Sequence, residues 1–200
     1  MESFLKAFVA YFVMVDPIGT SLVFNALTED HDGRYCRIMA ARAVIISTCL
    51  VLFFGFWGVD LLDVLGIQMD SFRIAGGFLI FYAAFGMITR PDNVESPHKA
   101  GYFKDISVYP LSIPLIAGPG CLTLTVLLFS KVRDEGTSLT PLVVAILAIF
   151  VLTYFSFLFS KFFTRLVGQT VGSMFNRLLG VILASLAIQF VADGIKGLWG

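Results

Sequence analysis

The chain alternates between long apolar stretches and short polar connections, and this pattern predicts its secondary structure. The apolar stretches cover residues 4–27, 40–59, 72–88, 108–129, 142–163 and 178–192. Each is close to the roughly 20 residues that an α-helix needs to cross the hydrocarbon core of a bilayer. Apolar residues fill these stretches on all sides instead of following one helical face. The pattern therefore predicts an all-α integral membrane protein with six transmembrane helices.

The composition agrees with a chain that lies in lipid. Hydrophobic residues make up 58% of the 200 residues and charged residues only 14%, whereas charged residues are about a quarter of an ordinary soluble domain. The formal net charge is zero, so nothing indicates a nucleic acid as partner. The first stretch lacks the basic segment and the cleavage site of a signal peptide, and we expect it to be retained as a span.

The distribution of lysine and arginine predicts the orientation in the membrane. With the N-terminus outside, the inner connections hold eight of the 14 basic residues and the outer segments hold four. The eight are Arg34, Arg37, Arg42, Arg90, Lys99, Lys104, Lys161 and Arg165, and the four are Lys6, Lys131, Arg133 and Lys196. Because basic residues accumulate in cytoplasmic loops, both termini are predicted to lie outside the cytoplasm.

Two landmarks recur along the chain at nearly the same spacing. Arg73 and Arg177 each begin an Arg-x-x-Gly-x-x-Leu motif, and they stand 104 residues apart. Pro17 and Pro119 stand 102 residues apart. A duplication explains this spacing, and since each unit holds three spans, the second unit must enter the membrane with opposite polarity. We therefore expect two inverted three-span repeats, residues 1–95 and 96–200, within one membrane domain.

The first and fourth stretches are interrupted, one by Asp16-Pro17-Ile18-Gly19 and the other by Gly118-Pro119-Gly120. Proline breaks a helix because it lacks an amide hydrogen and clashes with the preceding turn. At 1.5 Å per residue the breaks lie about 20 Å and about 16 Å into their spans, near the middle of the hydrocarbon core. Pro17 and Pro119 are predicted to start new half-helices, capped by Asp16 and Gly118. Harmless kinks are the alternative interpretation.

The free amides of two half-helices would suit a carboxylate or another anionic group. The candidate substrate-binding residues are Asp16, Pro17, Gly19, Thr20, Gly118, Pro119, Gly120, Thr123, Arg73 and Arg177. Asp16 is the acid placed deepest within a span, which predicts a coupling site for a proton or a cation; a helix cap is the alternative role. For Arg73 and Arg177 the alternatives are a bond to a substrate carboxylate and snorkelling towards the headgroups.

No group of residues predicts an enzyme, a cofactor or a metal site. Cys36, Cys49 and Cys121 have no CxxC spacing, and His31 and His98 stand in polar connections far from a cysteine or histidine with metal-ligand spacing. Nucleophilic or acid–base catalysis needs clustered side chains, and the sequence places no such cluster within the spans. We therefore expect a protein that is not an enzyme and that needs no cofactor or metal ion.

Three pieces of the sequence resemble the MarC family of inner-membrane proteins. They are Asp16-Pro17-Ile18-Gly19, the run PLSIPLIAGPG at residues 110–120, and Arg177-Leu178-Leu179-Gly180 continuing to Gln189 and Asp193-Gly194-Ile195. The resemblance covers essentially the whole chain and implies a six-span protein of two homologous halves in the bacterial inner (plasma) membrane. For some members it implies proton- or ion-linked movement of glycine, alanine and similar amino acids. Many members carry asparagine at the position of Asp16.

The breaks and the resemblance together predict a secondary transporter or exporter of a small neutral amino acid such as glycine or alanine. It would work by alternating access, with a proton as the candidate coupling ion. The alternatives are an uncoupled channel, a non-transporting membrane scaffold and, less favoured, a membrane enzyme. The sequence leaves the substrate, the direction of transport, the coupling ion and the oligomeric state open.

Overall fold

The computed structural model describes residues 2–28, 31–89 and 105–199, except the side chains of residues 2, 163–173, 175 and 176. In this part of the chain every regular element is a helix: α1 (Glu2–Val15), α2 (Pro17–Thr28), α3 (Gly33–Val64), α4 (Met69–Thr89), η1 (Ser107–Ile116), α5 (Pro119–Asp134), α6 (Thr140–Leu158) and α7 (Ser160–Trp199). Five helical spans and one bent pair, η1 with α5, are long and apolar enough to cross a membrane. The predicted all-α membrane protein is confirmed, and the bent pair, counted as one span, brings the candidate spans to the predicted six.

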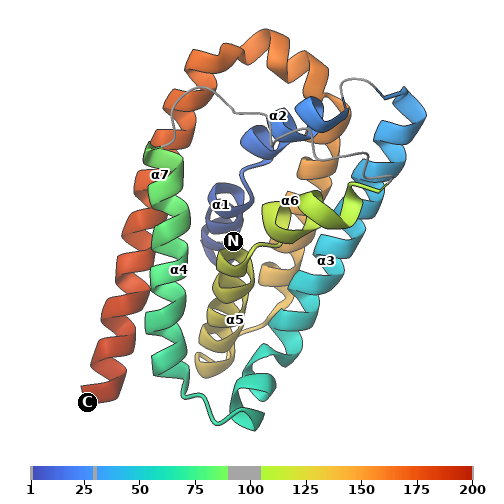
Figure 1. Ribbon diagram of the computed structural model, residues 1–200. Helices are drawn as coiled ribbons and strands as arrows, with labels where there is room; N and C mark the ends of the chain where they lie inside the picture. The colour runs from blue at the N-terminus through green and yellow to red at the C-terminus, as the bar shows by residue number, and fades with distance from the viewer. Residues whose placement is uncertain (1, 29–30, 90–104, 200) are drawn as a thin grey trace.

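The last two spans differ from the prediction at their ends. The fifth apolar stretch runs to residue 163, but α6 ends at Leu158 and α7 begins at Ser160. The polar segment before residue 178 is helical, so α7 has 40 residues and turns over the end of the bundle before it descends along α4 (Figure 1). Only the part from Arg177 to Trp199 has the hydropathy of a span. Backbone hydrogen bonds continue outside the lipid, so hydropathy does not locate a helix end.

The helices α4 and α7 pack side by side and antiparallel along one edge of the bundle (Figure 1). Glycines allow this approach: a Cβ on Gly77 would lie 2.9 Å from the carbonyl oxygen of Ala187, and one on Gly180 would lie 3.1 Å from that of Ala84. Small residues let membrane helices pack backbone to backbone. The opposite directions of these helices agree with inverted repeats. The boundary at residues 95 and 96 lies outside the described residues, and the inverted repeat stays a prediction.

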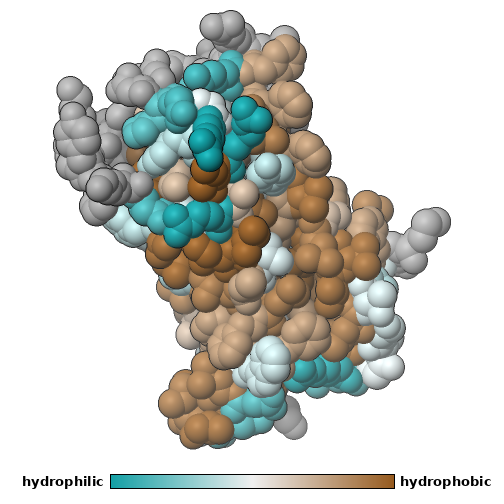
Figure 2. Space-filling model, turned by 90° about the vertical axis from the view of Figure 1, so that its right-hand side faces the viewer, coloured by the Kyte–Doolittle hydropathy of each residue, from teal (hydrophilic) through white to brown (hydrophobic). Residues whose placement is uncertain are grey.

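The surface of the bundle is divided into zones of different polarity. Figure 2 shows a hydrophobic belt over the middle of one face, with polar zones towards the two ends. Exposed large apolar side chains on α3 and α6 include Phe53, Trp57, Val151 and Phe155. An apolar surface of this extent requires lipid around it. We name the two ends the Arg42 end, where α2 ends and α3 begins, and the Arg73 end, where α3 ends and α4 begins.

Several residues on which sequence predictions rest lie outside the description: Arg90, His98, Lys99, Lys104 and the side chain of Arg165. Arg34 and Arg37 are exposed at the start of α3, whereas Lys131 and Arg133 are in the last turn of α5. These two groups lie at opposite ends of the bundle (Figure 1). Which end faces the cytoplasm stays a prediction.

Candidate functional site

The first break lies at Asp16, between α1 and α2. The Asp16 backbone has a φ of 47°, a left-handed conformation that aspartate tolerates better than most residues. Asp16 Oδ1 accepts a hydrogen bond of 3.0 Å from the amide of Gly19, and the Thr20 hydroxyl donates one of 2.8 Å to the Asp16 carbonyl oxygen. Pro17 is the first residue of α2. The predicted cap and half-helix are confirmed at this break.

The second break lies at Gly118, between η1 and α5. Gly118 has an extended backbone (φ −71°, ψ 168°), precedes Pro119 at the start of α5, and supplies no side-chain hydrogen bond to the helix. A Cβ at this position would lie 2.4 Å from the carbonyl oxygen of Pro114, which explains why glycine stands here. The two segments meet at an angle of 55°. The predicted half-helix is confirmed. No side chain of the N-cap residue accepts a hydrogen bond from its first amides.

The segment before the second break is not the regular α-helix that the sequence predicted. The depth of about 16 Å assumed a regular α-helix from residue 108, but Tyr109 and Ile113 in η1 have extended backbones. Pro110 and Pro114 follow these two residues, and a proline pushes the residue before it out of helical geometry. The rise per residue of an α-helix therefore does not apply here. The two prolines, four residues apart, were the signal that the prediction did not use.

The structure brings the two breaks together through α1 and α5. A Cβ on Gly120 would lie 2.2 Å from Met14 Cε, so the Met14 side chain covers the backbone just after the second break. One turn before Met14 on α1, the Tyr11 hydroxyl donates a hydrogen bond of 2.8 Å to Thr125 Oγ1. Both side chains of this bond are fully buried. Met14 and Tyr11 were not predicted as site residues, because apolar stretches contain many such residues.

Thr123 lies against α4, one turn after the second break. Its side chain is 4% exposed, and its methyl carbon would lie 1.9 Å from a Cβ on Gly76. Its hydroxyl makes no hydrogen bond with any residue that the structure describes. Its oxygen is not among the fully buried polar atoms that lack a partner in the described residues, so it keeps some access and is a candidate contact for a bound molecule. Ile80 of α4 lies beside Gly120, with its Cα 3.8 Å from a Cβ there.

The two predicted arginines lie away from the breaks. At the Arg73 end, Arg73 pairs with Asp70 at 2.7 Å and with Asp134 at 3.6 Å, which ties α4 to the end of α5. Arg177 is exposed on α7, one turn before Gly180, and Gly180 packs on the part of α4 furthest from Arg73. A role of either arginine in substrate binding stays a prediction.

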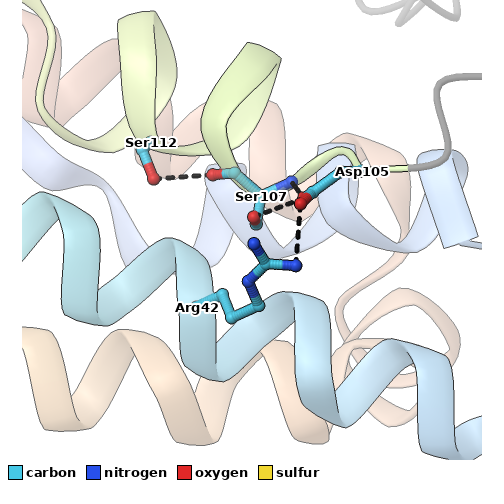
Figure 3. A network of polar contacts seen from close by, with 4 residues as sticks. All are labelled: Arg42, Asp105, Ser107 and Ser112. Carbon is cyan, nitrogen blue, oxygen red and sulfur yellow. Dashed lines mark hydrogen bonds and ion pairs between the residues drawn. The ribbon is translucent and has the colours of Figure 1, made fainter.

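At the Arg42 end, a polar network fastens η1 to α3 (Figure 3). Arg42 Nη1 lies 2.7 Å from Asp105 Oδ2, and Asp105 Oδ1 accepts hydrogen bonds from the amide and the hydroxyl of Ser107. The Ser112 hydroxyl lies 2.6 Å from the Ser107 carbonyl oxygen and 3.0 Å from that of Ala43. The bonds from Ser107, and then the charge of Arg42, lower the pKa of Asp105. The irregular half of the broken span is thus held at its start.

Comparison with known proteins places this architecture in a family. Residues 1–199 match the MarC family integral membrane protein model. The UPF0056 membrane protein YvbG of Bacillus subtilis is 32% identical, covering 100% of this chain and 97% of its own. The UPF0056 membrane protein YhcE of Escherichia coli is 29% identical, covering 98% of this chain and 93% of its own. No solved structure gives a significant match. The chain belongs to the MarC family of integral membrane proteins.

Proposed function

We propose that this protein is a secondary transporter of a small neutral amino acid such as glycine or alanine, and that the two helix breaks bind the substrate. The observation that carries the proposal is the approach of the breaks, since Met14 beside the first break covers Gly120 of the second. Transporters built from inverted repeats bind substrate where their broken helices meet. Movement of one half against the other would open the site to each side of the membrane in turn.

The second break is suited to the carboxylate of an amino acid. The first turn of α5 has no side-chain cap, and its amides and dipole favour an anion. The Thr123 hydroxyl adds a donor whose hydrogen-bonding capacity no described residue uses. Gly120 lacks a side chain, so a ligand can approach the backbone closely. A carboxylate bound here would satisfy both kinds of donor.

The first break is suited to the ammonium group or to a coupling proton. Asp16 is half-buried and uses Oδ1 to cap α2, while Oδ2 makes no hydrogen bond with the part of the chain that the structure describes. A carboxylate within a span must be paired or protonated. Substrate ammonium and a proton are the two partners that would meet this need during a transport cycle.

The cover over Gly120 favours a small substrate. The Met14 side chain already occupies the space beside this glycine, so a bound amino acid has little room for a side chain of its own. Methionine is flexible and can change rotamer without breaking a hydrogen bond. Met14 is therefore suited to move aside for glycine or alanine.

Uptake of labelled glycine and alanine into proteoliposomes tests the function. The wild-type chain is expected to give saturable uptake, and the double variant Asp16→Ala, Gly120→Leu is expected to lose it. The matched control is Gly33→Leu, because a side chain there meets no atom within 4 Å. Undiminished uptake by the double variant would refute the proposed site. Flux that rises linearly without saturation would favour a channel, and no flux of any small neutral amino acid would contradict transport.

A further inference from the structure

The outward face of α7 carries a stripe of residues with the spacing of a helix–helix contact. We name this stripe the outer seam: Leu178, Ile182, Ser185, Gln189, Ala192 and Lys196, alternately four and three residues apart and all exposed. A repeat averaging 3.5 residues keeps one line of side chains against a partner helix, as in left-handed coiled coils. The seam is about 27 Å long at 1.5 Å per residue, nearly the thickness of the hydrocarbon core.

Gln189 distinguishes this seam from a surface that faces lipid. It lies about 18 Å along the span from Arg177 and about 15 Å from Trp199, close to mid-depth. Its amide makes no hydrogen bond with any described residue, and it is exposed. An unpaired amide in hydrocarbon is destabilising, and no water lies at this depth to compensate for it. The exposed face of neighbouring α4 carries apolar and aromatic side chains instead, such as Phe78 and Phe85.

The opposite side of α7 is a helix–helix contact that is already made within the chain. Gly180, Ala187 and Gly194 lie there and pack closely on α4. At 3.6 residues per turn, this line is far around the helix from the outer seam. One side of α7 is thus occupied by α4, while no described part of the chain covers the other.

We propose that the outer seam packs against the same seam of a second copy of this chain, giving a two-fold symmetric dimer through α7. A glutamine amide is self-complementary, so two Gln189 side chains facing one another can each donate to the other's oxygen. Asp193, one turn after Gln189, is exposed and has no described ion-pair partner; in a parallel pair it lies within reach of the partner's Lys196. Ser185 and Ala192 flank Gln189 and are small enough for close approach.

The seam also specifies how many helices meet. One polar residue in an otherwise apolar seam fixes register and oligomeric state, because any other arrangement leaves it unpaired. An unrelated membrane protein would need its own amide at the same depth and its own charges in the same order. A second copy provides both by symmetry.

Cysteine cross-linking in native-like membranes tests the contact. In a full-length background with Cys36, Cys49 and Cys121 replaced by alanine, A192C is expected to form a disulfide-linked dimer when an oxidant such as copper phenanthroline is added. The matched control is A75C, since Ala75 is also an exposed alanine at a similar depth from the Arg73 end, on α4. Equal cross-linking of the two variants would overturn the proposal.

Subunit counting in lipid bilayers tests the role of Gln189 itself. Loss of the paired amides in Q189L is expected to weaken dimerisation by about tenfold, while I188L, beside the seam, leaves it unchanged. Circular dichroism of monomeric Q189L should show unchanged helix content, which separates lost association from misfolding. A monomeric wild-type chain, or a Q189L chain that dimerises as the wild type does, would overturn the proposal. Lost uptake in Q189L with an unchanged dimer would also overturn it and assign Gln189 to the transport path.

Discussion

Each helix break has a proline at its centre, but the first amides of the helix that follows are capped differently at the two breaks. At the first, the Asp16 carboxylate caps α2 by accepting from Gly19, and α1 and α2 follow one another in a span of 26 residues. At the second, Gly118 offers no side chain to α5, and the span bends by 55°. The first helix end is capped by a side chain of the chain itself, and the second has no side-chain cap.

The comparison shows that prolines at corresponding positions of the two halves do not produce equivalent helix ends. Proline determines where the helix stops, because it removes an amide and restricts its neighbour. The residue just before it determines whether the next helix end is already satisfied. We therefore expect the substrate carboxylate at α5 and the coupling or ammonium-binding role at Asp16. Four substitutions can break or sharpen this comparison.

The largest effect is expected from Asp16→Ala, which removes the cap and places alanine at a φ of 47°. Loss of a cap and left-handed strain together destabilise the protein by about 2–4 kcal/mol. Asp16→Asn keeps the cap and tolerates this backbone, so it should lose less than about 1 kcal/mol. Unfolding in mixed micelles measures both variants. Equal destabilisation by the two would mean that the charge, and not the cap, stabilises the first break.

The next effect is expected from Gly120→Leu at the second break. The leucine must displace Met14 and crowd Ile80, and such overpacking is destabilising by about 1–3 kcal/mol. The same cost, met in the complex with glycine, corresponds to roughly 5- to 150-fold weaker glycine binding. A ligand-induced thermal shift measures it, since a ligand that binds only the folded state raises the melting temperature.

The control for this variant is Gly33→Leu, whose added side chain meets open space. It should retain the full thermal shift with glycine. A Gly120→Leu protein that keeps the same shift as Gly33→Leu would place the carboxylate somewhere other than at the start of α5.

A smaller effect is expected from Thr123→Val, which removes the hydroxyl and keeps the methyl group that packs on Gly76. Stability should be unchanged or slightly higher, because the hydroxyl has no partner in the described part of the chain. Glycine binding should weaken by about 2- to 10-fold, the range of one hydrogen bond. In the control Thr153→Val the lost hydroxyl was bonded to Ile149, so stability falls but binding does not. The opposite pattern in Thr123→Val would give its hydroxyl a purely structural role.

The smallest effect is expected from Asp105→Asn, at the network that holds η1. The pKa of Asp105 is lowered in the folded protein, so its stabilising effect is present above the unfolded value of about 3.9 and is lost as pH falls through the folded pKa. Both partners of the ion pair are substantially exposed, which limits the contribution to about 0.2–1 kcal/mol. Unfolding from pH 7 to pH 2 should show the two proteins converging at low pH. A constant difference across this range would exclude the ionised carboxylate as the cause.

Much of the fold could be predicted because its signals are local. Span length follows from runs of apolar residues, and the starts of α2 and α5 follow from single prolines with a cap before them. The irregular backbone of η1 is also encoded locally, by Pro110 and Pro114, although the apolar run around them predicted a continuous span. The contacts of the site were not predictable in this way. Met14 and Gly120 are far apart along the chain, and nothing in either residue type points to the other.

The sequence by itself determined that this is a membrane protein, which segments are candidate spans, and where two of these segments break. These features depend on the solvation of each segment and on the chemistry of proline, which need no distant partner. Only the tertiary structure decided that the two breaks meet through Met14 and Tyr11, that Asp16 caps its own helix, and that Gln189 is left on an open face of α7. Those outcomes depend on packing between residues such as Tyr11 and Thr125, 114 positions apart, and such packing is fixed only when all helices are in place.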